Sequence, residues 1–204
     1  MSVMRLKRLI DVVVSTASLL LAGPILVVVG GIVRLRMGSP VLFGQTRPGL
    51  HGRPFTLYKF RTMGEGDGDD TDRLTSVGRF LRASSVDELP ELINVLKGDM
   101  SLVGPRPLLM RYLDRYSADQ ARRHEMRPGL TGWAQVNGRN AITWEQKFDY
   151  DVWYVDHWSI ALDIKIMWMT MKQVLLGTGV AAPGHATMPE FMGSDRLGES
   201  EIGR

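Results

Sequence analysis

The hydrophobic positions of the chain form one long run near the N-terminus and several shorter periodic stretches after it. Residues 12–33 are almost continuously apolar. A run of about 22 residues is long enough to cross a bilayer as a helix. Gly23 and Pro24 lie at its midpoint, and both weaken helix continuity. The pattern therefore predicts an apolar helix with a break near its centre.

Basic residues flank both ends of this run: Arg5, Lys7, Arg8, Arg34 and Arg36. Positive flanks favour the cytoplasmic side, and each half of roughly 16 Å reaches only halfway through the hydrocarbon. We therefore predict that residues 1–36 form a re-entrant membrane helix, broken at Pro24, that enters and leaves one leaflet. An ordinary span with a proline kink is the alternative. Asp11 is expected to pair with Arg8 or Lys7 at the interface.

Alternating residues after the apolar run predict a small β-hairpin. Residues 41–47 and 54–63 have the pattern of short strands, and the glycine-containing stretch 48–52 has that of a turn. In the second strand Lys59 and Arg61 alternate with apolar and aromatic residues, so one face is basic. Solvent exposure alone would also account for that face.

The rest of the chain has mainly helical periodicity. It predicts an amphipathic helix at 108–126, a short extended piece at 133–137, a helix at 144–154 and an apolar helix at 158–176. The last of these is expected to lie at a membrane interface, with a buried core helix as the alternative. Residues 65–72 are acidic and glycine-rich, typical of a mobile loop or lid, and 194–204 are expected to be a disordered tail. The predicted fold is α+β and mainly helical, with a catalytic domain at 37–193.

The stretch 84–107 carries the candidate chemistry. Ser85 and Glu88 have capping-box spacing, which predicts a helix start, and Gly98 is expected to end the helix. Asp87 would then lie at a helix N-terminus, where free N–H groups and the dipole keep a carboxylate ionised and favour phosphate. Arg106, between two prolines, is a second fixed phosphate donor. Capping and solubility alone are the simpler explanation of the acidic pair.

Composition limits the kinds of partner and of metal site that the protein can have. The formal charge of +3 and a pI near 9.3 favour an anionic partner: nucleic acid, a membrane surface or a phosphorylated substrate. The chain has no cysteine, which excludes disulfides and thiolate metal sites, and its four histidines do not have zinc-ligand spacing. Nothing in the sequence matches a nucleic-acid-binding motif, so no nucleic-acid partner is expected.

Four motifs carry a family resemblance: KFRTM at 59–63, DELP at 87–90, KGDMSLVGPRP at 97–107 and RPGLTGWAQVNGR at 127–139. With them, the chain resembles the small monotopic phosphoglycosyl transferases of bacteria, the bacterial sugar transferase family. The likeness extends from the basic N-terminus to about Gly193. Within the family it is most similar to members that transfer phospho-N,N'-diacetylbacillosamine for protein N-glycosylation.

The resemblance implies that a UDP-sugar and undecaprenyl phosphate give a polyprenyl diphosphate-linked sugar and UMP, at the cytoplasmic face of the bacterial inner membrane. It implies Mg²⁺ held by Asp87. It also places the family's nucleophile on Asp87, which would form a covalent phosphosugar-aspartyl enzyme, with Glu88 assisting as a base or through the metal. The basic residues implied to bind the substrate phosphates are Lys59, Arg61, Arg82 and Arg106. Arg139 would contact the nucleotide sugar.

Two other interpretations remain open at this stage. In the first, the same transfer is direct and uses a ternary complex, with Asp87 only a metal ligand. In the second, the protein is a membrane-anchored basic scaffold without catalytic activity. The scaffold accounts for the charge and the apolar segments, but not for the stretch from Asp87 to Arg106.

Overall fold

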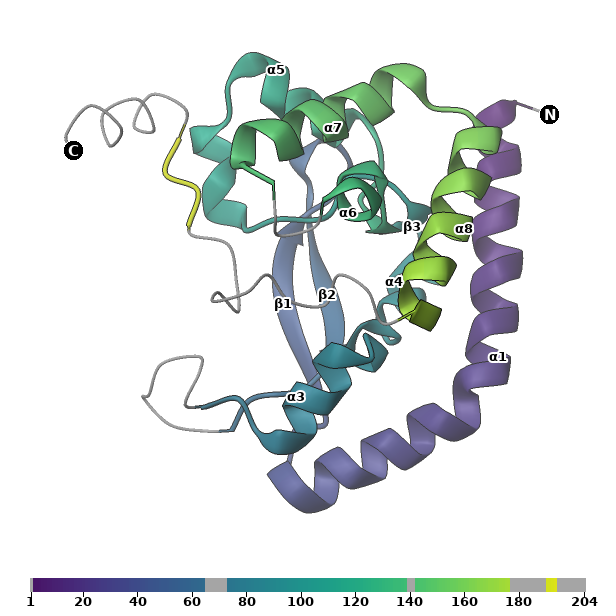
Figure 1. Ribbon diagram of the computed structural model, residues 1–204, viewed down its shortest axis with the longest axis vertical. Coiled ribbons are helices and arrows are strands. Elements are labelled where there is room, and N and C mark those ends of the chain that lie inside the picture. Colours follow the sequence, from purple (N-terminus) through teal and green to yellow (C-terminus); the bar gives the residue numbers. More distant parts are fainter. Residues whose placement is uncertain (1, 65–72, 139–141, 177–189, 194–204) are drawn as a thin grey trace.

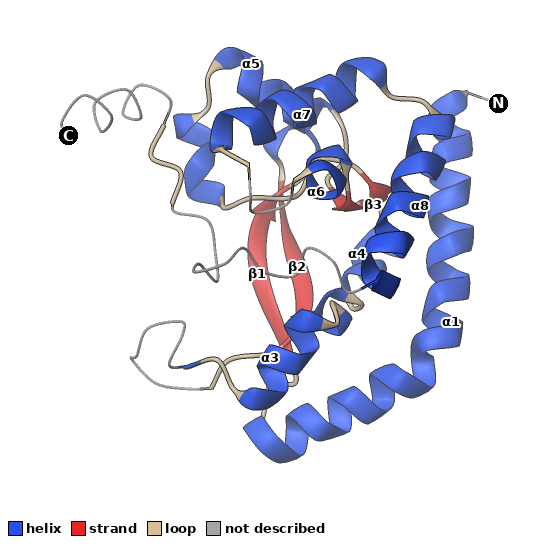
Figure 2. Ribbon diagram, in the orientation of Figure 1, coloured by secondary structure: helices blue, strands red, loops and turns tan. Residues whose placement is uncertain are grey.

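The computed structural model describes residues 2–64, 73–138, 142–176 and 190–193 (Figure 1). These residues form a mainly helical molecule with two small two-stranded sheets (Figure 2). The predicted fold class, α+β and mainly helical with one long apolar N-terminal helix, is confirmed. The predictions for 65–72 and 194–204 lie outside the described residues, as does Arg139.

Helix α1 spans Val3–Met37 and continues through Pro24 without leaving helical geometry. Figure 1 shows that it changes direction partway, first running beside α8 and then turning beneath α3. The first stretch therefore packs on the globular part, and Val29 and Val33 in the second stretch are buried against Phe60 and Leu81. The predicted break is thus a bend within one continuous helix.

Most of the outward surface of α1 is apolar and exposed, as at Leu20, Leu21 and Leu35. By length and composition, α1 is long and apolar enough to cross a membrane. Its buried residues include three polar side chains near the start: Lys7, Asp11 and Ser15. The helix therefore has an apolar outer surface and a polar inner attachment.

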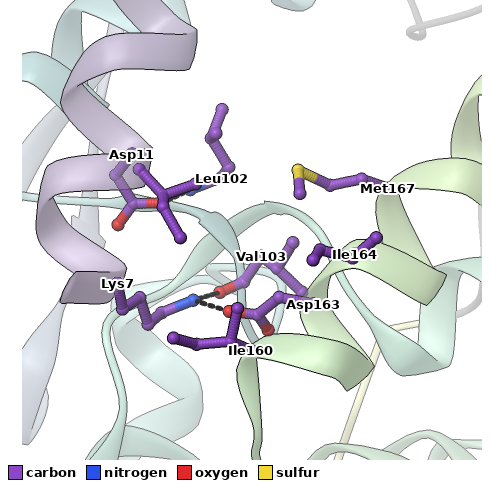
Figure 3. Close-up of a pocket in the computed structure, with 9 residues that line it drawn as sticks. Lys7, Asp11, Leu102, Val103, Ile160, Asp163, Ile164 and Met167 are labelled. Carbon is purple, nitrogen blue, oxygen red and sulfur yellow. Dashed lines mark hydrogen bonds and ion pairs between the residues drawn. The ribbon is translucent and has the colours of Figure 1, made fainter. Parts of the chain in front are cut away.

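That attachment joins α1 to the strand β3 (Ser101–Val103) and to α8 (Ile160–Leu176). Lys7 donates to the Val103 carbonyl at 3.0 Å and pairs with Asp163 at 2.6 Å, as drawn in Figure 3. Asp11 accepts hydrogen bonds from Ser101 Oγ at 3.1 Å and from the Leu102 backbone N–H at 3.0 Å. The predicted pairing of Asp11 with Arg8 or Lys7 is therefore wrong, because tertiary partners take both Asp11 and Lys7.

The predicted hairpin is confirmed. Strands β1 (Leu42–Pro48) and β2 (Pro54–Phe60) pair antiparallel, from Leu42 opposite Phe60 to Pro48 opposite Pro54. The short 3-10 turn η1 (Leu50–Gly52) joins them, with Gly52 at φ 72°. The hairpin lies across the centre of the molecule in Figure 1.

The region after the hairpin differs from the predicted single capped helix. Helix α3 (Ser76–Ala83) is followed by a 3-10 turn η2 (Val86–Glu88) and then by α4 (Glu91–Lys97). Ser85 has φ 56° and makes no capping bond, so the predicted capping box is wrong. An N-cap residue needs extended backbone, which Ser85 does not have. The predicted end of the helix at Gly98 is confirmed, since Gly98 is left-handed at φ 92°.

The second sheet pairs β3 in parallel with β4 (Gly129–Thr131). Backbones approach closely here: a Cβ on Gly104 would lie 2.2 Å from the Arg127 carbonyl oxygen, so only glycine fits. The residues after β4 form helix α6 (Trp133–Asn137), and the predicted extended piece is therefore wrong.

The predicted helix at 108–126 is also wrong as one element. It is divided into η3 (Met110–Arg115), α5 (Ala118–Ala121) and η4 (Arg122–Glu125). Tyr116 is extended, and Ser117 starts a new helical turn through a capping box with Gln120. The periodicity is real, but local capping interrupts the helix.

Two later helices agree with their predictions. Helix α7 (Trp144–His157) begins with a capping box between Thr143 and Gln146, and α8 follows it. The main core lies where α4, β3, α6, α7 and α8 meet, with Val95, Met100, Tyr154 and Ile166 among its buried members. The opposite side of α8 is apolar and exposed, including Trp168 and Leu175.

Candidate active site

The η2 turn places Asp87 in a buried position beside several charged groups. Asp87 is 7% exposed, and its carboxylate accepts no hydrogen bond from any of the described residues. Burial and then the negative charge of Glu88 raise the pKa of Asp87 to about 6, against the lowering effect of Lys59, Arg82 and Arg106. Asp87 is thus a carboxylate that ionises below neutral pH and has a free lone pair.

Glu88 has the opposite surroundings. Lys59 Nζ donates to Glu88 Oε1 at 2.7 Å, and Arg106 forms a two-pronged pair with both carboxylate oxygens. Burial alone would raise the pKa of Glu88, but the charges and hydrogen bonds of Arg106 and Lys59 outweigh it and hold the pKa well below its usual range. Glu88 therefore stays ionised and holds two cations in fixed positions.

A third carboxylate, Glu91 at the start of α4, belongs to the same cluster. It is 1% exposed and its Oε1 lies 3.0 Å from Lys59 Nζ. Sequence analysis assigned it no role. The available signal was its spacing, because a residue three after Glu88 and four after Asp87 lies on the same side of a helical segment.

The cations come from three separate parts of the fold. Lys59 lies on β2 and Arg106 follows β3, whereas Arg82, on α3, donates from Nε to Thr62 Oγ1 at 3.1 Å. All three are close enough to lower the pKa of Asp87. The structure thus brings Lys59, Arg82 and Arg106 together around Asp87, as the predicted phosphate-binding set requires.

Arg61 is placed differently. Its Nη1 donates to the Ser39 carbonyl at 3.1 Å, and its guanidinium lies beside Gly38 at the end of α1. It is not among the charges that shift the pKa of Asp87. The described contacts of Arg61 therefore connect the hairpin to α1, and its predicted phosphate-binding role stays a prediction.

Buried polar bonds fix the two sides of the cluster. Asn94 on α4 accepts from the Tyr58 backbone N–H at 3.1 Å and donates to the Thr56 carbonyl at 2.7 Å, which attaches α4 to β2. This attachment sets Lys59 against the acidic side chains. On the other side, the Arg106 carbonyl accepts from Arg123 Nη2 at 2.8 Å.

Arg123 is itself held by a buried ion pair. Its Nη2 lies 2.6 Å from Asp151 Oδ2, and both side chains are almost completely enclosed. Pro105 and Pro107 restrict the backbone on either side of Arg106. The position of Arg106 is thus determined by residues far apart in sequence, which sequence analysis did not identify.

The carboxylates at this site fit a magnesium ion that takes one or two of its ligands from the protein. Among the described residues, no three His, Cys, Asp or Glu side chains form a metal-binding group. Mg²⁺ is commonly held by one or two carboxylates together with substrate phosphates and water. Asp87 has an unused carboxylate for that purpose, and Glu88 is engaged by Lys59 and Arg106.

Comparison with known proteins identifies the family to which the chain belongs. A family model described as "Bacterial sugar transferase" matches residues 2–177. The chain belongs to this family. The match includes every element that forms the charged cluster, and members of the family are sugar transferases.

Individual relatives carry more specific names. An uncharacterized sugar transferase of Bacillus subtilis, EpsL, is 56% identical over 94% of this chain and 98% of its own length. The UDP-glucose:undecaprenyl-phosphate glucose-1-phosphate transferase of Escherichia coli is 41% identical over 81% of this chain and 39% of its own. The undecaprenyl-phosphate galactose phosphotransferase of Salmonella typhimurium is 40% identical over 85% and 41%. The chain therefore spans nearly all of the first relative and about two fifths of the other two.

Proposed function

We propose that this protein transfers a sugar 1-phosphate from a UDP-sugar to undecaprenyl phosphate and releases UMP. The names of the Escherichia coli and Salmonella typhimurium relatives support the substrate class and the reaction. The charged cluster supports the chemistry, because phosphoryl transfer requires fixed positive groups around the transferred phosphate. The exposed apolar surface of α1 suits an acceptor that resides in a membrane.

In the proposed first step, an Asp87 carboxylate oxygen attacks the phosphorus that bears the sugar. An Asp87–phosphorus bond forms, the bond from that phosphorus to the bridging oxygen breaks, and UMP leaves with the electron pair. In the second step, an oxygen of the lipid phosphate attacks the same phosphorus and releases Asp87 as a carboxylate. Both steps balance without a redox partner.

The remaining residues neutralise and orient. Arg106 and Lys59 face the position where negative charge develops, and Glu88 holds both in place. The pKa of Asp87, about 6, leaves the nucleophile mainly ionised at neutral pH. Mg²⁺, held by Asp87 and the substrate phosphates, would supply further charge neutralisation.

This proposal depends on one observation. The buried carboxylate of Asp87 accepts no hydrogen bond among the described residues, whereas the neighbouring Glu88 is paired with Lys59 and Arg106. The decisive experiment mixes the protein with a UDP-sugar and Mg²⁺ but without lipid acceptor. We expect one UMP per protein and a mass gain of one phosphosugar on the peptide containing Asp87. UMP release only with acceptor would indicate direct transfer. No release under any condition would favour the basic scaffold.

We further propose that α1 is re-entrant, with both ends at the cytoplasmic face of the inner membrane. The bend in α1 and the basic flanks support this arrangement. Because the chain has no cysteine, Ser2→Cys and Asp119→Cys can be labelled singly in intact and in permeabilised cells. Labelling from the same side is expected. Labelling from opposite sides would show a spanning helix.

The sugar remains a separate proposal. The resemblance of the sequence favours diacetylbacillosamine, whereas the Escherichia coli and Salmonella typhimurium relatives are named for glucose and galactose. That subgroup likeness depends on residues 184–187 and on Phe191, and of these 184–187 lie outside the described residues. Comparing UMP release from UDP-glucose, UDP-galactose and UDP-N,N'-diacetylbacillosamine decides between them.

A further inference from the structure

Glu91 is a buried acid that the proposed reaction does not use. Its Oε1 lies 3.0 Å from Lys59 Nζ but makes no aligned hydrogen bond. The same ammonium lies 2.7 Å from Glu88 Oε1. One lysine is therefore shared between two carboxylates. Among the described residues, Glu88 forms a second ion pair, with Arg106, whereas Glu91 forms none.

The groups that face Glu91 from the surrounding elements are Lys59 on β2, Glu88 on η2, Arg106 after β3 and Arg47 on β1. Burial, together with the negative charge of Glu88, raises the pKa of Glu91 to about 7 against the lowering effect of Lys59 and Arg106. A carboxylate in this position changes charge within the ordinary range of pH. The charge on Lys59 that is available to a ligand changes with it.

We propose that Glu91 is a positioning residue that sets how strongly Lys59 binds the diphosphate of the nucleotide sugar. When ionised, Glu91 retains the ammonium between itself and Glu88. When protonated, it releases the ammonium toward the phosphate. This inference rests on the proposed function and adds to it a residue that determines substrate affinity.

The direction of the effect follows from linkage. A bound diphosphate draws the Lys59 ammonium away from Glu91 and adds negative charge, so both changes raise the pKa of Glu91 in the complex. Glu91 therefore takes up a proton on binding, and affinity falls as pH rises above about 7. Each unit of pKa difference between free and bound protein changes the dissociation constant by about tenfold.

The test uses the full chain in detergent with Asp87→Asn, so that neither turnover nor titration of Asp87 contributes. Its ligand is the UDP-sugar that releases UMP from the unmodified protein. This diphosphate diester keeps a constant charge from about pH 6 to 8.5. By calorimetry we expect the Kd to rise about tenfold over that range. Adding Glu91→Gln should remove the rise up to pH 8 and, relative to Asp87→Asn alone, tighten binding about tenfold at the upper end.

Two controls isolate Glu91. Glu125→Gln makes the same chemical change at an exposed ion pair and should leave the pH profile unchanged. Lys147, whose pKa burial lowers to about 8, also lies near Arg106, so its loss of charge above pH 8 should weaken binding equally in both proteins. The difference between the two proteins therefore reports Glu91 alone.

An unchanged pH profile in Glu91→Gln would overturn the inference, as would loss of binding at every pH in a folded variant. If that variant does not fold, the Asp87→Asn protein still decides. At pH 7 its binding enthalpy should differ between buffers of different ionisation enthalpy, showing uptake of a fraction of a proton. No uptake would refute the inference. If no UDP-sugar releases UMP or binds at any pH, the proposed function itself fails.

Discussion

Two groups of buried acids in this molecule have opposite surroundings. Asp163, where α8 meets α1, accepts hydrogen bonds from Lys7, Tyr154 and Trp158. Asp87, in the η2 turn, accepts none among the described residues, and within the same part of the chain Glu91 forms an ion pair with Lys59 alone. Both groups are similarly buried, so burial alone does not separate a structural acid from a reactive one.

The difference lies in how completely each carboxylate is satisfied. Buried polar groups with full hydrogen bonding hold a fold in one arrangement, and the exceptions need another explanation. An acid left without donors costs stability and retains its reactivity. The acids bonded to α1, β3 and Arg123 therefore build the frame, and Asp87 and Glu91 are the groups that the frame leaves available.

Removing the Asp87 carboxylate should have the largest effect. An Asp87→Asn protein should lose at least about a thousandfold in turnover, because an amide is a poor nucleophile. It should form no covalent phosphosugar adduct by intact mass measurement. Glu88→Gln should be strongly impaired yet still form some adduct. An adduct that maps to Glu88 in the unmodified protein would reverse the two roles.

Removing an acid that is fully paired within the fold should instead reduce the stability of the protein. Asp151→Ala leaves the Arg123 guanidinium buried without its partner, and we expect a loss of about 3–5 kcal/mol in unfolding free energy. Chemical denaturation in detergent measures this loss. Asp119→Ala, at an exposed pair with Arg122, is the matched control and should change little. Equal losses in both variants would remove the contrast between the two kinds of acid.

Substituting Arg106, whose guanidinium pairs with both oxygens of Glu88, should reduce turnover less than removing the Asp87 carboxylate does. Arg106→Lys keeps the charge but cannot form the two-pronged pair with Glu88, so turnover should fall about tenfold or more. Arg106→Ala should lose more. Steady-state kinetics with both substrates measures these changes. Near-normal turnover in the lysine variant would show that only long-range charge matters at this position.

Acid should slow formation of the adduct. Because burial raises the pKa of Asp87 to about 6, the rate of the first step should halve near pH 6 and fall about tenfold for each unit below it. Rapid-quench measurement of UMP release without acceptor follows this step. A rate that stays constant down to pH 5 would mean that Asp87 is ionised by a stronger interaction than the structure contains.

The raised pKa of Asp87 also predicts that removing this acid stabilises the protein, whereas removing Asp151 destabilises it. Asp87 has a folded-state pKa above its ordinary value of 3.8, so its stability contribution is favourable below that value and is lost as pH rises through about 6. At pH 8, Asp87→Asn should therefore raise the unfolding free energy, by about 1–3 kcal/mol. At pH 4 the gain should disappear. A destabilised variant at pH 8 would place Asp87 with the structural acids.

The sequence by itself determined the elements whose signals are local. The apolar run of α1, the β1–β2 hairpin, the start of α7 at Trp144 and the end of α4 at Gly98 all follow from neighbouring residues. It also identified Asp87, Glu88, Lys59, Arg82 and Arg106, which the fold brings together. Those residues lie in motifs that are recognisable without knowledge of their contacts.

Tertiary structure alone decided the surroundings of each charge. Ser85 and Glu88 have capping-box spacing, yet Glu88 turns to Lys59 and Arg106 because two cations stabilise a carboxylate more than one backbone N–H does. Asp11 bonds to β3, and not to its neighbour Arg8, for the related reason that buried donors need an acceptor. Which acid is satisfied and which is left reactive depends on partners distant in sequence, and no local pattern encodes them.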